Sequence, residues 1–324
     1  MQDREEVDRD ATQLDSESER EALVDAGGST TSRRSDSRPR PSVPPRLVFA
    51  HEDRRRPEEL SRRLSPERLK RLACLAACAL VVLPAGSAIG AEHKGFPWHK
   101  RVREATRFLA GRVGSASFAA VDERGRVHGF RASVQYSSAS LVKAMLLTAY
   151  LDRRDVRRRD LHAGERHLLG PMVRVSDNDA ASAVYERVGM GGLSRLAHRA
   201  GMRRFVPYPV WGGCQVTARD QARFFARIRS LLPQRHRKYA LGLLRRIVSY
   251  ERWGIPRGAP RGWTPFFKGG WFPDDDGWRV HQAALLRKGH RRISIAVLTR
   301  GDPSLEYGAT TISGVTSRLL RGYR

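Results

Sequence analysis

Residues 140–151 read Ser-Leu-Val-Lys-Ala-Met-Leu-Leu-Thr-Ala-Tyr-Leu, and this stretch does most to decide the fold. Its apolar residues stand at positions 141, 142, 145, 146 and 147, a spacing that predicts a helix with a buried face. Positions i and i+3 of a helix share a face, so Ser140 and Lys143 are expected to lie side by side at its start. The stretch therefore predicts a core helix that also carries reactive side chains.

Elements on both sides of this helix predict an α+β fold. Short strands at 117–122 and 126–131 form a hairpin around Glu123-Arg-Gly125. Further helices are expected at about 103–109, 164–174, 179–188, 192–200, 218–231, 236–248 and 310–321, and further strands at about 264–268, 279–287 and 291–299. In this order, N-terminal and C-terminal strands share one antiparallel sheet flanked by helices, with a block of helices between them. Thr217 is the predicted N-cap of the 218–231 helix, with Asp220 three residues on.

The first third of the chain reads differently. Residues 1–69 are rich in Ser, Asp, Glu, Arg and Pro, which predicts a disordered charged tail. Residues 70–91 combine a basic flank, an apolar run and a small-residue exit, typical of a signal peptide or a single-span membrane anchor. Either one predicts that the domain at 96–324 is extracytoplasmic, secreted or anchored at a bacterial cell envelope.

The net charge of +26 lies entirely in the C-terminal part. Residues 1–71 contain 16 basic and 16 acidic residues, so the excess falls on residues 72–324. The arginines are scattered and accompany no nucleic-acid motif, so no specific nucleic-acid partner is expected. Arginine far outnumbers lysine, which a codon bias toward GC would produce without any function; an intermediate interpretation is association with an anionic cell envelope, which needs only the long-range field. The oligomeric state does not follow from the sequence.

Cysteine usage predicts neither a disulfide nor a zinc site. Cys74 and Cys78 lie in the apolar segment, so a processed chain keeps only Cys214. Asp274-Asp-Asp276 is acidic but lacks further spaced ligands, so a solvated turn is expected there. No metal and no cofactor is predicted.

Three short motifs carry the candidate chemistry. They are Ser140-Leu-Val-Lys143 at a helix start, Ser176-Asp-Asn178 between two helices, and Lys268-Gly-Gly270 with Trp271 at the end of a strand. Each occurs by chance in many proteins, as a simple amphipathic helix, a helix cap or a strand-ending turn. Their combination, in this order and on these elements, is much more specific.

Their residue types suit nucleophilic acyl transfer. A serine hydroxyl needs a base before it attacks a carbonyl, and a lysine shielded from water can serve as one. The free N–H of Ser140 at a helix start can stabilise an oxyanion. Ser176 can pass a proton to a leaving nitrogen, and Lys268 offers a positive charge for a substrate carboxylate.

With the flanking Ala119-Ala-Val-Asp122, these motifs resemble the class A β-lactamase and penicillin-binding transpeptidase superfamily over about residues 96–324. The resemblance implies an antiparallel sheet with an all-helical lobe. It also implies these catalytic residues: Ser140 as acylated nucleophile, Lys143 as its base or proton shuttle, Ser176 as proton relay and Lys268 for the carboxylate or for tuning Ser176. The implied substrate-binding residues are Asn178, Gly269, Gly270 and Trp271, with the N–H groups of Ser140 and Trp271 forming the oxyanion hole.

Three departures from the family pattern stand out. The middle of the strand motif is Gly269 where the family carries a hydroxyl residue, and only 36 positions separate Ser140 from Ser176, so the helical lobe is trimmed. Residues 202–216 stand where the family supplies a hydrolytic glutamate, and they contain no Asp or Glu. Slow deacylation follows, unless a distant carboxylate such as Glu186 or Glu251 folds into the site.

The sequence thus predicts an exported serine hydrolase that forms an acyl-enzyme on Ser140 with β-lactams or D-alanyl cell-wall peptides. The alternative is a non-catalytic module of the same fold that binds cell-wall peptide. A Ser-His-Asp triad is disfavoured because the chain has no Gly-x-Ser-x-Gly elbow. His281, in a predicted strand, is expected to face the surface or the cleft, and Trp211 the core or the cleft wall.

Overall fold

The computed structural model describes residues 95–324. The predictions for residues 1–69 and 70–91 lie outside the described residues. Within 95–324, no helix has the length and apolar character needed to span a bilayer.

One antiparallel sheet organises the domain, in the strand order β2-β1-β7-β6-β5. Its members are β1 (Ser115–Val121), β2 (Val127–Phe130), β5 (Thr264–Asp274), β6 (Gly277–Lys288) and β7 (Arg291–Asp302). β1 pairs along its length with β7, from Ser115 opposite Arg300 to Val121 opposite Ser294. The predicted sharing of one sheet by N-terminal and C-terminal strands is confirmed.

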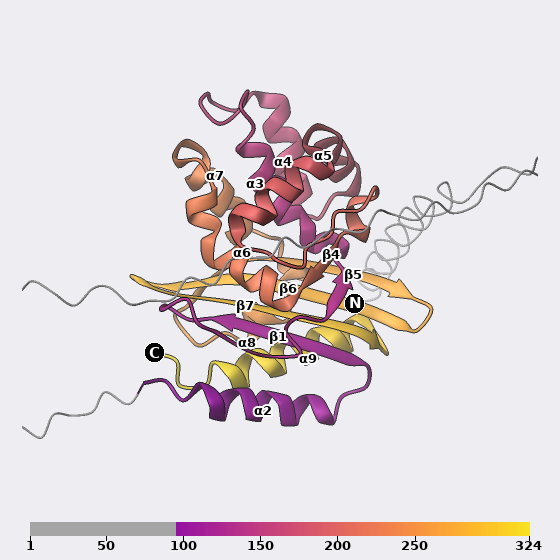
Figure 1. The fold of residues 1–324 in the computed structure, drawn as a ribbon, viewed down its shortest axis with the longest axis vertical. Helices are drawn as coiled ribbons and strands as arrows, with labels where there is room; N and C mark the ends of the chain where they lie inside the picture. Colours follow the sequence, from indigo (N-terminus) through magenta and orange to yellow (C-terminus); the bar gives the residue numbers. More distant parts are fainter. Residues whose placement is uncertain (1–94) are drawn as a thin grey trace, which may run out of the picture. The chain divides into compact units, whose positions relative to one another are not determined.

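Helices cover both faces of this sheet (Figure 1). α2 (Trp98–Ala110), α8 (Ile255–Gly258) and α9 (Leu305–Leu319) lie on one side. The other side carries α3 (Lys143–Leu151), α4 (Ala163–Arg174), α5 (Asn178–Ala200), α6 (Ala218–Leu231) and α7 (Gln234–Arg245). α6 packs directly on β1 and β7, and the remaining helices of this side form the all-helical lobe.

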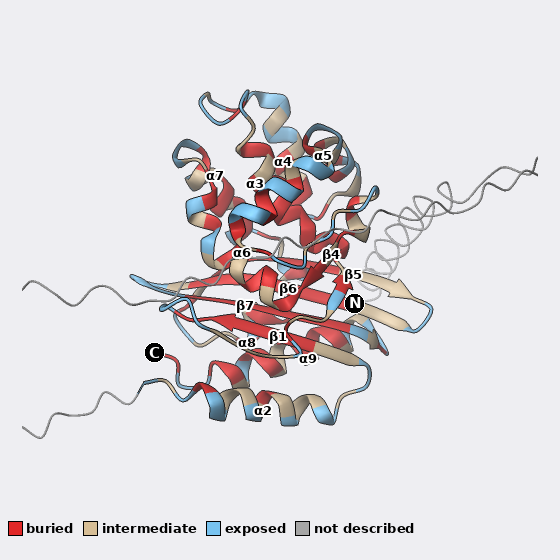
Figure 2. Ribbon diagram, viewed as in Figure 1, coloured by how far each residue is buried: buried red, intermediate tan, exposed pale blue. Residues whose placement is uncertain are grey.

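The core has two parts because strand side chains alternate between faces. Ala119 and Val121 of β1 pack with the helical lobe, whereas Phe118 and Ala120 pack with α2 and α9. Figure 2 shows the buried residues running along the strands and the inner sides of the helices. The edge strand β5 packs against α7 of the lobe and against the short helix that contains Ser140. The Lys268-Gly-Gly270 motif of this strand thus lies close to the Ser140-Leu-Val-Lys143 motif.

Several element boundaries differ from prediction. The predicted helices at 179–188 and 192–200 form α5, with Gly189 at a φ of +64° marking the kink between them. The strand predicted at 264–268 continues to Asp274, and the last helix begins at Leu305 instead of about 310. A small second sheet pairs β3 (Gln135–Ser137) with β4 (Gln215–Thr217) and was not predicted, since three residues are too few for a periodic pattern.

Candidate active site

Ser140 lies in a short 3-10 helix, η2 (Ala139–Val142), and Lys143 begins α3 directly after it. The prediction of an α-helix from Ser140 is therefore wrong in its first turn. Ser140 is 5% exposed and Lys143 is fully buried. Ala139 adopts a φ of +43°, which strains a residue with a side chain. Strain next to Ser140 indicates that surrounding contacts hold this turn in place.

Those contacts come from three segments. The Ser138 N–H donates to the Cys214 carbonyl at 2.8 Å, and the Ser138 hydroxyl donates to the Gly212 carbonyl at 3.2 Å. From the sheet, Nε2 of His281 lies 3.0 Å from the Ser137 carbonyl oxygen. The turn before Ser140 is therefore tied to both the lobe and the sheet.

Lys143 Nζ is surrounded by oxygens of the second motif. It donates to the Ser176 carbonyl in a short hydrogen bond, to the Ser176 hydroxyl at 3.3 Å and to Asn178 Oδ1 at 2.6 Å. It also lies 4.6 Å from the centre of the Trp211 ring. The structure thus brings the first two motifs together, as their expected roles require.

The second motif combines a structural and a site role. Ser176 has a φ of +59°, a further strained backbone position within the site. Asp177 is the N-cap of α5 and accepts a hydrogen bond from the Ala180 N–H at 2.7 Å. The helix-cap interpretation therefore holds for Asp177, while Ser176 and Asn178 face Lys143.

The strand motif approaches Ser140 through Gly270. A Cβ on Gly270 would lie 2.8 Å from the Ser140 backbone nitrogen and 2.5 Å from that of Leu141. Only glycine allows β5 to approach η2 this closely. The approach brings the backbone of Gly270 beside the Ser140 N–H, where an oxyanion hole was expected.

Lys268 is fully buried and makes an ion pair with Glu251 at 3.1 Å. Glu251 is the last residue of the short 3-10 helix η4 (Ser249–Glu251) and is 1% exposed. Of the two distant carboxylates considered, Glu251 thus contacts a site residue, while Glu186 is exposed. The partner of Glu251 is the strand lysine, so the pair balances a charge that was expected to meet substrate.

An aromatic ring occupies the space over Gly269. A Cβ there would lie 3.2 Å from two ring carbons of Trp253, and the Trp253 and Trp271 rings meet edge to face at 6.0 Å. Trp253 therefore packs where the family's hydroxyl side chain would begin.

His281 corrects a sequence prediction. It is fully buried, not at the surface or in the cleft, and it stands opposite Gly270 in the pairing of β5 with β6. The Thr299 N–H donates to its Nδ1 at 3.2 Å, which leaves Nε2 to donate to the Ser137 carbonyl. Burial lowers the pKa of His281 to about 4, so the ring is neutral at neutral pH.

Segment 202–216 is anchored by side chains from neighbouring helices. Thr217 caps α6 as predicted, accepting from the Asp220 N–H at 3.1 Å. The Asp220 carboxylate, however, accepts from the N–H groups of Arg203 and Arg204 at 3.1 and 2.9 Å, so it ties down this segment as well as standing in the first turn of α6. Trp211 donates through Nε1 to Ser182 at 3.1 Å, which holds its ring over Lys143.

Sequence reasoning made no prediction for Trp253, expected Trp211 only in the core or the cleft wall, and placed His281 at the surface or in the cleft. None carries a spacing signal, because each reaches the site from a different segment. Cys214 packs in the same region, and burial raises the pKa of its thiol to about 11, which makes it unreactive.

Comparison with known proteins agrees with this fold. Residues 164–323 match the model of the beta-lactamase enzyme family. No curated protein matches the sequence.

Solved structures share the fold. A β-lactamase from Sphaerobacter thermophilus aligns with a TM-score of 0.59 at 18% identity, over 71% of this chain and 99% of that one. A class A β-lactamase from Mycobacterium abscessus aligns at 0.57 and 20%, over 69% and 99% of the two chains. PBP-A aligns at 0.57 and 18%, over 69% and 96%. The chain thus shares the fold of class A β-lactamases and PBP-A, and its residues 164–323 resemble the beta-lactamase enzyme family.

Proposed function

We propose that this protein is an acyl-transfer enzyme that forms an acyl-enzyme on Ser140 and releases the acyl group slowly. The observation that carries the proposal is the environment of Lys143, a buried lysine whose Nζ bonds the Ser176 hydroxyl and Asn178. A nucleophile, a base and a second hydroxyl from three segments are what such chemistry needs.

In the proposed reaction, Ser140 Oγ attacks the carbonyl carbon of an amide and its proton passes to the neutral amine of Lys143. The N–H groups of Ser140 and Trp271 stabilise the oxyanion. The C–N bond then breaks, and the leaving nitrogen takes a proton through the Ser176 hydroxyl. The product is an ester on Ser140, and Asn178 keeps Lys143 in position throughout.

Slow release follows from what lies beside Lys143. A base that activates water is worth on the order of 10²–10⁴-fold in rate. Residues 202–216 contain no Asp or Glu, and Trp211 of this segment lays its ring 4.6 Å from Lys143 Nζ. Glu251 is engaged by Lys268. Neither this segment nor Glu251 therefore offers the ester a carboxylate to activate water.

The proposed substrates are β-lactams or D-alanyl cell-wall peptides, met outside the cytoplasm. A variant of the structural neighbour PBP-A was solved as an acyl-enzyme complex with penicillin G, which supports β-lactams as probes. The excess of basic residues after residue 71 supports association of the domain with an anionic cell envelope.

Intact-mass measurement after incubation with penicillin G tests the proposal. We expect one adduct on the full chain, none on Ser140→Ala, and an unchanged adduct on Ser230→Ala, whose exposed hydroxyl lies on α6. With a chromogenic cephalosporin, one equivalent should be released before the signal becomes nearly flat. No adduct, or an adduct that survives Ser140→Ala, contradicts the assignment of the nucleophile. Sustained fast turnover contradicts slow release.

A second function, binding of cell-wall peptide without turnover, has one observation in its favour. Glu251 neutralises Lys268, and Trp253 fills the space over Gly269, so the strand motif offers less to a substrate carboxylate than its sequence suggests. Saturable binding of a D-alanyl peptide by the wild type, with neither peptide nor penicillin ever attached to Ser140, would favour this function.

A further inference from the structure

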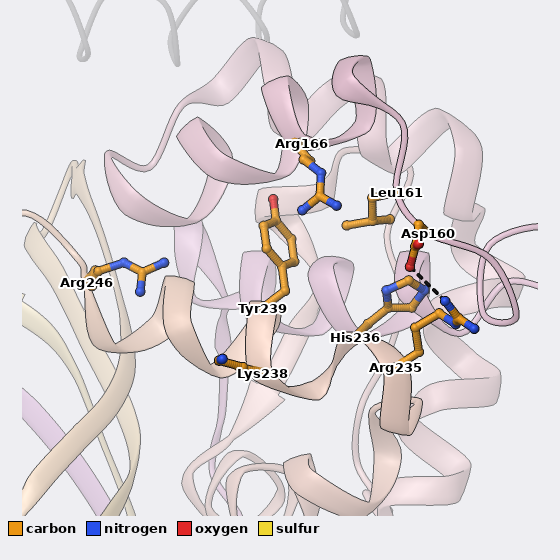
Figure 3. A pocket seen from close by; sticks show the side chains of 8 residues that line it. All are labelled: Asp160, Leu161, Arg166, Arg235, His236, Lys238, Tyr239 and Arg246. Carbon is orange, nitrogen blue, oxygen red and sulfur yellow. Dashed lines mark hydrogen bonds and ion pairs between the residues drawn. The ribbon is translucent and has the colours of Figure 1, made fainter.

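A pocket away from Ser140 lies between α4, α7 and the loop before α4. Its volume is about 350 Å³, large enough for a small ligand. Figure 3 shows its lining, which includes Asp160, Arg166, Arg235, Lys238, Tyr239 and Arg246. The chemistry proposed at Ser140 uses none of these residues.

The lining carries an excess of positive charge. Arg235 makes an ion pair with Asp160 at 2.8 Å, which neutralises both. Arg166, Lys238 and Arg246 have no carboxylate partner among residues 95–324. Three cations thus border one pocket with their charges unbalanced, an arrangement that favours an anionic occupant.

Tyr239 lies between two of these cations. The guanidinium of Arg166 is 5.5 Å from the centre of its ring, and the hydroxyl points toward Arg166 (Figure 3). Burial raises the pKa of Tyr239, against the opposing effect of Arg166 and Arg246 nearby, so the phenol keeps its proton at neutral pH. It can therefore donate a hydrogen bond toward the same space as the two guanidinium groups.

The pocket walls are held together by bonds at their far ends. Arg174, the last residue of α4, donates through Nε to the Arg246 carbonyl at 3.1 Å. The Val248 N–H donates to the Arg174 carbonyl at 3.1 Å. Arg166 and Arg246, both exposed, therefore project from walls with a fixed relative position.

We propose that this pocket binds a phosphate group. Two guanidinium forks, an ammonium and a phenol offer donors from several directions, and a tetrahedral oxyanion can accept from all of them. A planar carboxylate has fewer acceptor sites and matches one fork. The phosphate can belong to a free monoester or to the phosphodiester of an anionic polymer, two sources that share this chemistry. The site is independent of acylation at Ser140.

Calorimetric titration of the full chain with inorganic phosphate, at constant ionic strength in chloride, tests this proposal. Arg166→Gln and Arg246→Gln should each weaken binding about tenfold or more, since charged hydrogen bonds to an anion are lost. Tyr239→Phe keeps the ring packing and should weaken phosphate binding by a few-fold. This variant still tests the proposal if an arginine variant folds poorly. Ser140→Ala should bind phosphate as the wild type does.

Two controls separate a built site from the general basic charge. Arg124→Gln removes an exposed arginine from the β1–β2 turn, and Arg195→Gln removes one from another arginine-lined pocket of the lobe. The proposal is overturned if these controls weaken binding as much as Arg166→Gln, or if acetate binds as tightly as phosphate. Failure of phosphate to bind the wild type at millimolar concentration overturns it too. Competition by glycerol 3-phosphate against a glycerophosphodiester then distinguishes the two sources.

Discussion

The two halves of the candidate site each bury a lysine, and the two lysines have different partners. On the helix side, Lys143 donates to a carbonyl, a hydroxyl and an amide oxygen. On the strand side, Lys268 meets the carboxylate of Glu251. The oxygens around Lys143 carry no formal charge, whereas the partner of Lys268 is a carboxylate. The same residue type thus has uncharged partners in one half of the site and a charged partner in the other.

The largest expected effect separates the two lysines by their chemistry. Lys143→Met should slow acylation of Ser140 by on the order of 10²–10⁴-fold, because the general base is removed. Lys268→Met should slow it less. Stopped-flow measurement with a chromogenic cephalosporin compares them, with Lys288→Met, an exposed lysine at the end of β6, as control. Equal losses of acylation rate in Lys143→Met and Lys268→Met would contradict different roles for the two lysines.

The free energy of unfolding should depend more on Lys268 than on Lys143. Lys268→Met leaves Glu251 buried without its partner, which costs about 3–5 kcal/mol of unfolding free energy. The double variant Lys268→Met with Glu251→Gln should recover much of that loss. Lys143→Met breaks hydrogen bonds to uncharged oxygens and should cost less. Urea denaturation of the wild type and these three variants measures the differences, and a double variant as unstable as Lys268→Met would contradict the ion-pair argument.

His281 links the two halves and provides a pH test. Its folded pKa of about 4 lies below the ordinary value of 6.5, so on acidification the unfolded chain takes up a proton first. This contribution to stability is complete above about pH 6.5 and is lost as the pH falls toward 4, by about 3 kcal/mol in total.

His281→Gln keeps a donor for the Ser137 carbonyl and does not titrate. Its unfolding free energy should therefore fall less steeply than that of the wild type between about pH 6.5 and 4. If the unfolding free energies of the two proteins fall equally with pH, protonation of His281 does not contribute to the loss of stability in acid.

The smallest effect concerns the two glycines of the strand motif. Gly269→Ala places a methyl group 3.2 Å from Trp253, whose ring can shift slightly, so we expect a cost of about 1 kcal/mol. Gly270→Ala meets backbone atoms of Ser140 and Leu141 and should cost more, with a matching loss of acylation. Thermal unfolding and the adduct assay compare the stability and the acylation of the two variants. A larger loss of either in Gly269→Ala would show that Gly269, and not Gly270, is the glycine that joins the two halves of the site.

Local patterns in the sequence were sufficient for the order of elements, the shared sheet and the three motifs. Apolar spacing at 141–147 predicted the helix behind Ser140, and Thr217 predicted the start of α6. A helix face and an N-cap depend on residues only three or four positions apart, so their patterns can be identified in the sequence itself. The resemblance then related Ser140, Lys143, Ser176 and Lys268 to one site, and the structure brings Lys143 and Ser176 into contact.

Only the tertiary structure decided what surrounds those motifs. Glu251 meets Lys268, Trp211 covers Lys143, Trp253 packs over Gly269 and His281 is buried, each through contacts between separate segments. No periodicity encodes these contacts, because they depend on how β5, η4 and segment 202–216 pack against the lobe. By itself the sequence determined which groups can do chemistry, and packing decided which of them carry charge, which are shielded from water and which are held in place.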